Sequence, residues 1–209
     1  MIRSLLCLLF LVAYSSNAQD RIEIQFDSHQ FAEMYEIETL RFYISNIELH
    51  GKNETHFKEE NSYHLVDLEE PESWVIRYPN AKFNVQLDSI SFLIGTDSLA
   101  NVSGILEGDL DPIKGMYWAW NSGYINFKVE GKKRDSNTHF EYHLGGYLPP
   151  HATSRKLTFP INTDEVILIK LNLSQFLDQI DMQLLNEVMI PGADAVQLSN
   201  QLSNYFSIE

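Results

Sequence analysis

Cysteine is almost missing from this sequence. Cys7 is the only one, and it lies in an apolar run near the N-terminus. The rest of the chain therefore has no disulfide framework, no thiolate metal ligand and no cysteine nucleophile. Its stability has to come from a hydrophobic core, and 209 residues are enough for one large domain.

The motifs that mark common enzymes are missing as well. The sequence contains no Gly-x-Ser-x-Gly nucleophile turn, no glycine-rich phosphate loop, no dinucleotide-binding fingerprint and no His-Glu-x-x-His helix. Carboxylates are so common in the chain that no acid–base pair can be singled out. We therefore expect a binding protein rather than an enzyme.

Basic residues are scarce relative to acidic ones. The chain has 15 Lys and Arg against 29 Asp and Glu, which gives a formal net charge of −14. Nucleic acids and anionic membrane surfaces repel so negative a protein, and we expect neither as a partner. The charge suits a soluble protein or one that meets cations.

No apolar run is long enough to span a membrane, and the one short run lies at the N-terminus. Met1-Ile2-Arg3 precedes an apolar stretch from Leu5 to Tyr14, and Ser16-Asn17-Ala18 fits a small-x-small cleavage pattern. Residues 1–18 are thus predicted to be a secretory signal peptide, cleaved after Ala18. The mature chain would have 209 − 18 = 191 residues and would be periplasmic or secreted.

Apolar and polar residues alternate along most of the remaining chain, which predicts β-strands. The expected strands are residues 21–26, 40–49, 62–68, 83–94, 116–129, 138–144, 155–160 and 165–173. Residues 52–61 and 96–112 read as loops, and 193–206 reads as a closing helix. These features predict an all-β fold, an antiparallel β-sandwich or barrel of about eight strands with a C-terminal helix. We expect the sandwich, as a single domain over residues 19–209.

One stretch, residues 108–131, combines an acidic turn with a cluster of aromatic residues. It holds two of the three tryptophans, Trp118 and Trp120, with Met116 before them. Residues two apart in a strand point to the same face, so the two rings would lie side by side. Such a pair can be ordinary core packing or the wall of a site.

Two of the seven histidines are candidate metal ligands. His64 alternates with Val66 and Leu68, so it is expected on a core face, where an imidazole needs a hydrogen-bond partner or a metal. His143 precedes Gly145-Gly146, and two glycines without side chains let the backbone approach another group closely or turn sharply there. Imidazole ligands without thiolate favour copper over calcium or magnesium, although a hydrogen-bonded core histidine is the alternative.

The acidic turn offers a rival cation site. Asp97, Asn101, Asp109 and Asp111 carry oxygen ligands on a glycine-bearing segment. Their spacing does not match a helix–loop–helix calcium motif. Capping and Asx-turn roles are the alternative explanation for these residues.

Six stretches, in matching order over nearly all of the mature chain, resemble the MbnP-like domain, a family of exported copper-binding proteins named for a methanobactin-associated periplasmic protein. They are Phe42-Tyr-Ile-Ser-Asn-Ile47, Tyr63-His-Leu-Val-Asp67, Gly108-Asp-Leu-Asp-Pro112, Gly115-Met-Tyr-Trp-Ala-Trp-Asn-Ser-Gly-Tyr124, His143-Leu-Gly-Gly146 and Met189-Ile-Pro-Gly192.

The resemblance implies a β-rich domain that binds copper through His64 and His143. It also implies that Trp118 or Trp120 can be oxidised to kynurenine beside the copper by a di-haem partner related to peroxidases and MauG. Met189 could add a thioether ligand for Cu(I), with core packing as its alternative role. A histidine expected in relatives just before Met-Ile-Pro-Gly is replaced here by Asn186-Glu187-Val188.

The sequence therefore predicts an exported protein that binds or delivers copper next to a tryptophan-rich strand. A β-sandwich module that binds a protein or glycan without metal is the alternative. That alternative predicts that His64 and His143 lie far apart.

Overall fold

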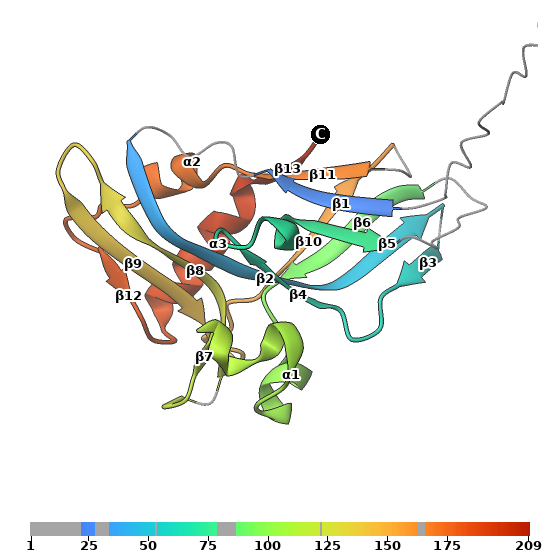
Figure 1. Cartoon of the computed structure of the whole chain (residues 1–209), viewed down its shortest axis with the longest axis horizontal. Helices are drawn as coiled ribbons and strands as arrows, with labels where there is room; N and C mark the ends of the chain where they lie inside the picture. The colour runs from blue at the N-terminus through green and yellow to red at the C-terminus, as the bar shows by residue number, and fades with distance from the viewer. Residues whose placement is uncertain (1–21, 28–33, 53, 79–86, 122, 163–165) are drawn as a thin grey trace, which may run out of the picture.

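The computed structural model describes residues 22–27, 34–52, 54–78, 87–121, 123–162 and 166–209. The predicted signal peptide lies outside these residues. The described chain forms two β-sheets that pack face to face, and a small lobe lies on the outer face of the larger sheet (Figure 1). Within the described chain, no helix is both long and apolar enough to cross a membrane.

The larger sheet is organised around β2, which runs from Tyr35 to Gly51. On one side of β2, its first part pairs with β8 (Gly123–Lys133) and its second part with β6 (Leu87–Ile94). On the other side, it pairs with β4 (Tyr63–Asp67) and then β3 (Glu54–Lys58). The long strand thus carries two branches of the sheet, which diverge from it.

Further strands extend the two branches. Beyond β8 lie β9 (Thr138–Gly145) and the short β12 (Glu187–Val188), and beyond β6 lies β10 (Arg155–Pro160). β12 runs parallel to β9, with Glu187 opposite Glu141 and Val188 opposite Tyr142. This pairing brings the segment before Met189 to the edge that carries His143.

The smaller sheet has the order β13-β11-β1-β5. Its strands are β13 (Phe206–Ile208), β11 (Val166–Leu171), β1 (Ile22–Asp27) and β5 (Val75–Tyr78), and the 3-10 turn η1 (Pro71–Trp74) leads into β5. β1 and β11 are parallel, whereas the other pairs are antiparallel. Both sheets are therefore mixed, and the described chain has thirteen strands. The predicted β-rich architecture is confirmed, but its strictly antiparallel order and eight strands are not.

The core lies between the sheets because alternate residues of β2 point inward. Leu40, Phe42 and Ile44 are buried there, and Phe42 stacks on Phe127 of β8 with ring centroids 5.7 Å apart. Two helices close the core, α2 (Leu173–Asp178) and α3 (Ala193–Leu202). The predicted C-terminal helix is thus present, but it ends in η4 (Ser203–Tyr205), after which β13 adds a strand to the smaller sheet.

The lobe, residues 97–121, contains four short elements instead of the predicted loop and strand. They are α1 (Ser98–Ser103), η2 (Gly108–Leu110), η3 (Pro112–Lys114) and β7 (Tyr117–Trp118). Around Tyr43 and Tyr124 the lobe closes a second apolar cluster on the outer face of the larger sheet. The predicted strand over 116–129 is broken, because β7 folds back antiparallel to β8, with Trp118 opposite Gly123. Likewise, the predicted loop over 52–61 contains β3.

Candidate functional site

The two candidate histidines lie on opposite faces of the larger sheet. His64 is opposite Ile44, whose side chain belongs to the inner core, so His64 is on the inner face. His143 is opposite Lys128, which is opposite Arg41 on the outer face. Because β2 and β8 separate β4 from β9, the two histidine strands are three strand spacings, about 14 Å, apart. One copper ion cannot be bound by both imidazoles in this arrangement, so the expectation of a shared site does not hold.

His64 belongs to a hydrogen-bond cluster around the carboxylate of Glu59. Glu59 Oε2 accepts hydrogen bonds from Ser62 Oγ at 2.5 Å, from Tyr78 OH at 2.8 Å and from His64 Nε2 at 2.8 Å. Tyr78 lies on β5 in the smaller sheet, so the cluster links the two sheets. Burial disfavours the charged carboxylate, but the hydrogen bonds from His64 and Ser62 outweigh it and hold the pKa of Glu59 below its usual value.

This cluster makes a pH-dependent contribution to stability. A carboxyl group whose pKa is lower in the folded state stabilises the fold above its unfolded pKa, and the contribution is lost as pH falls through the folded pKa. Glu59→Gln is expected to lower the free energy of unfolding by about 2 kcal/mol at neutral pH and to reduce the loss of stability below pH about 4. Urea unfolding at several pH values measures both effects.

Glu107→Gln changes an exposed residue of the lobe and is the matched control. It should leave the free energy of unfolding and its pH profile unchanged. An equal change in the two variants would show that the Glu59 cluster does not contribute specifically.

The environment of His143 favours a neutral imidazole with a defined tautomer. His143 is 5% exposed, and its Nε2 lies 2.7 Å from Glu130 Oε1, which is also 3.2 Å from Lys128 Nζ. Hydrogen bonds from Thr39 and His143 keep the pKa of Glu130 low although burial opposes this. Because an ionised carboxylate only accepts hydrogen bonds, Nε2 carries the hydrogen and Nδ1 keeps its lone pair.

The pKa of His143 supports the same assignment. Burial lowers it, the nearby Lys128 charge acts in the same direction, and the Glu130 hydrogen bond opposes the shift only in part. A neutral imidazole whose N–H is held by a carboxylate is the usual form of a metal-binding histidine. Of the two candidate histidines, His143 therefore has the environment more typical of a metal ligand.

Met189 directly follows β12, whose parallel pairing with β9 ends at Val188. Val188 is opposite Tyr142, and both side chains are in the inner core. Continuing this register by one residue would place Met189 beside His143 on the outer face. Further along the two segments, Pro191 lies close to Gly146, because a β-carbon at Gly146 would be 3.1 Å from Pro191 Cβ. The chain after β12 therefore continues beside the end of β9.

The two tryptophans have different environments. Trp118, in β7, is 6% exposed, whereas Trp120 lies in the turn after β7 and is 64% exposed. Their ring centroids are 5.6 Å apart, so the predicted pair exists, although Trp120 is not part of the strand. The Trp118 ring lies directly on Gly145, where an added β-carbon would be 2.5 Å from Cζ3. Gly145 shares the outer face of β9 with His143, two residues away, so Trp118 is the tryptophan next to the histidine.

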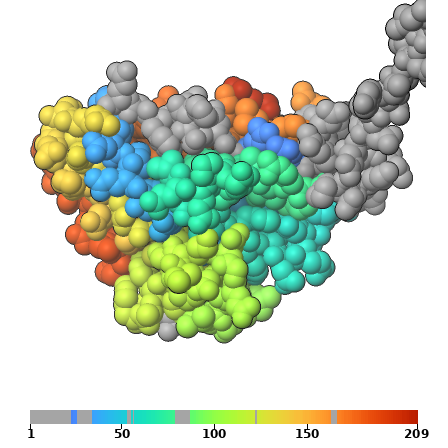
Figure 2. Space-filling view, in the orientation of Figure 1, coloured from blue at the N-terminus to red at the C-terminus, as the bar shows by residue number. Residues whose placement is uncertain are grey.

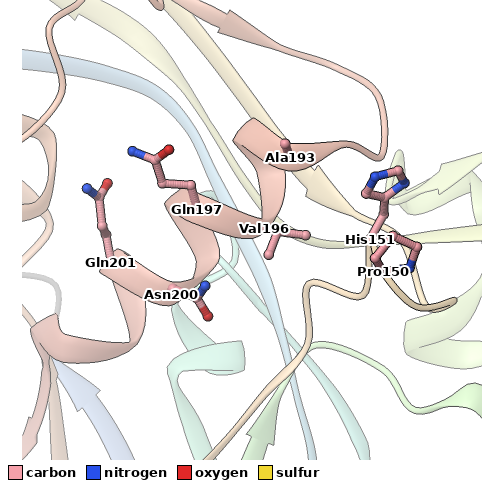
Figure 3. Close-up of a pocket in the computed structure, with 7 residues that line it drawn as sticks. All are labelled: Pro150, His151, Ala193, Val196, Gln197, Asn200 and Gln201. Atoms are coloured by element: carbon pink, nitrogen blue, oxygen red, sulfur yellow. The ribbon is translucent and has the colours of Figure 1, made fainter.

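A cavity of about 410 Å³ adjoins this region, between α3 and the segment that follows β9 (Figure 3). Its walls are carboxamide, imidazole and apolar side chains, and none is a carboxylate, lysine or arginine. The lining residues are Pro150, His151, Ala193, Val196, Gln197, Asn200 and Gln201. Gly146, the residue after Gly145, lies against one wall of the cavity, because a β-carbon there would lie 2.5 Å from the His151 carbonyl oxygen.

The acidic residues of the lobe serve as caps and turn acceptors. Asp97 accepts from Ala100 N at the start of α1 and from Tyr63 OH, both at 2.9 Å. Asp109 Oδ2 accepts from Leu65 N at 3.0 Å, and Asp111 accepts from Ile113 N at 2.9 Å. The Asn101 side chain bridges α1 and β8 by accepting from Tyr124 N at 2.9 Å. These contacts correspond to the capping alternative rather than to a calcium loop.

Within the described residues, no three His, Cys, Asp or Glu side chains are grouped to hold a metal ion. The donor set at the His143 edge is one imidazole and, by register, one thioether. Sequence reasoning did not identify Glu130 or the role of Gly145. The structure closes the β8–β9 hairpin across residues 134–137, with Lys133 opposite Thr138, and this register places Glu130 and His143 on one face of neighbouring strands.

The fold and this edge define a class of protein, a β-rich domain with a histidine and a tryptophan pair on the outer face of a mixed sheet. The sequence matches the model of the MbnP family over residues 13–190, and the chain belongs to that family. It is similar to a solved structure, MbnP from Methylosinus trichosporium, with a TM-score of 0.60 and 11% identity over 90% of this chain and 96% of that chain. That likeness shows a common fold. No curated protein matches the sequence.

Proposed function

We propose that this protein is exported to the periplasm or beyond the cell and binds or delivers copper. The supporting observation is the His143 edge, where a buried imidazole is held through Nε2 by Glu130 and has Met189 next in register. Imidazole and thioether together suit copper, and the thioether favours Cu(I). Family membership supports the same function.

In this proposal, His143 binds copper through Nδ1 and Met189 binds it through Sδ. Glu187, in the stretch 186–188 that stands where a histidine is expected shortly before Met-Ile-Pro-Gly in relatives, lies opposite Glu141 in the β9–β12 pair. Two soft donors hold a metal less firmly than three or four, and water or a group from an acceptor protein would complete the coordination. Such a site suits transfer of copper better than permanent storage, and it requires no catalytic role.

The tryptophan pair would connect this site to the surface. Trp118 lies next to His143 through Gly145, and the exposed Trp120 contacts Trp118. An oxidising partner, such as the di-haem protein that the family resemblance implies, could withdraw electrons through Trp120. Trp118 would then be the residue converted to kynurenine.

Mass spectrometry of protein from its native host is expected to locate kynurenine at position 118. Trp118→Phe should abolish the modification, and Trp120→Phe should lower the modified fraction because the exposed ring relays the oxidation. Modification of Trp120 with Trp118 intact would contradict this assignment.

Copper titration of the metal-free protein tests the function itself. We expect a Kd tighter than about 1 µM, which corresponds to about −8 kcal/mol and is a modest requirement for copper. Weaker binding would favour the alternative, a binding module without metal. The separation of His64 from His143 agrees with that alternative, so the titration decides between the two functions.

A further inference from the structure

Exposed hydrophobic side chains are concentrated in the lobe. Ten large hydrophobic side chains are exposed in the described chain, and five of them fall within residues 99–120. These five form what we call the lobe surface: Leu99, Val102, Ile105, Ile113 and Trp120, each at least 64% exposed. Single exposed hydrophobic residues are ordinary, but a concentration of them marks an interaction site.

The fold keeps these side chains outward for a definite reason. Ala100 and Asn101 of α1 point to the sheet and are buried, and Asn101 bonds to Tyr124 N. Leu99 and Val102 are one turn apart on the opposite side of the same helix. The lobe projects from the body of the molecule, as Figure 2 shows in yellow-green, so its outer side is accessible to a large partner.

The charge around the lobe surface has one sign. Its carboxylates are Asp97, Glu107, Asp109 and Asp111, and its one basic residue, Lys114, pairs with Glu70 at 3.0 Å. A second copy of a chain with net charge −14 would bring like charges together. An anionic membrane would do the same. The surface is complementary to an apolar patch surrounded by cations.

We propose that the lobe surface is the docking site for a basic protein that presents apolar side chains ringed by Lys or Arg. Trp120 is its expected anchor, because tryptophan contributes strongly to protein interfaces when a partner covers it. Carboxylates at the rim speed association and make binding salt-dependent. This inference does not depend on copper binding.

The test uses the whole protein labelled with ¹⁵N and a synthetic amphipathic helical peptide of leucine and lysine. We expect chemical-shift changes concentrated in residues 97–121 and affinity that falls as ionic strength rises. A peptide with glutamate in place of each lysine should not bind. The triple variant Leu99→Ser/Val102→Ser/Ile105→Ser, which keeps the net charge, should bind the lysine peptide at least about tenfold more weakly.

The control variant is Leu184→Ser, which removes a side chain that is 84% exposed outside the lobe. It should bind as the original protein does. Unchanged binding by the triple variant would mean attraction by charge alone and would overturn the proposal. Binding of the glutamate peptide, of lipid vesicles, or of a second copy in sedimentation experiments through the lobe would overturn it equally.

Discussion

Replacing His143 by alanine is expected to weaken copper binding by more than about 100-fold. The imidazole is the one nitrogen ligand of the proposed site, and Glu130 fixes its orientation through Nε2. Losing a carboxylate that orients a metal-binding histidine costs about 10–100-fold in affinity, so losing the ligand itself should cost more. Competition with a copper chelator of known affinity measures the effect for each variant.

Three variants make this result specific. His64→Ala should leave copper affinity unchanged, because His64 is on the other face of the sheet and pairs with Glu59. His143→Gln offers Glu130 a hydrogen-bond donor without an imidazole, so it separates lost binding from lost folding. Glu130→Gln removes the charge that holds Nε2 and should weaken binding about 10–100-fold. If His64→Ala abolishes binding and His143→Ala does not, the proposed site is wrong.

Gly145→Ala is expected to destabilise the fold strongly, by about 3 kcal/mol. The added methyl group would lie 2.5 Å from Trp118 Cζ3 and 2.9 Å from the Tyr124 carbonyl oxygen. The backbone oxygen can move only by disturbing the β8–β9 pairing, and the Trp118 ring is buried, so either shift costs stability. A loss of about 9 °C in Tm should accompany it, with a change in tryptophan fluorescence.

Gly192→Ala is the matched control for that substitution. A β-carbon at Gly192 meets no atom within 4 Å, and its φ of 179° is extended backbone open to any residue. Its effect should stay within about 0.5 kcal/mol. Similar destabilisation by both variants would show that the Trp118 contact does not limit the space at Gly145.

Strand positions were predictable where alternation is long and unbroken. Residues 138–144 and 155–160 are strands as expected, because each has a regular polar and apolar face. The lobe was not predictable in this way. Asp111 caps a turn locally, but Asp97 and Asp109 stabilise the lobe through hydrogen bonds to Tyr63 and Leu65, which are distant in sequence.

The sequence by itself determined the family, the β-rich fold, the candidate His143 and the Trp118–Trp120 pair, since each depends on residue type and local spacing. Only the tertiary structure decided which of the candidate site residues lie close together. Strand order is set by pairing between distant segments, and this order places His64 and His143 on opposite faces. The pairing of β12 with β9 brings the segment before Met189 to the edge that carries His143, and the pairing of β7 with β8 brings the Trp118 ring to Gly145.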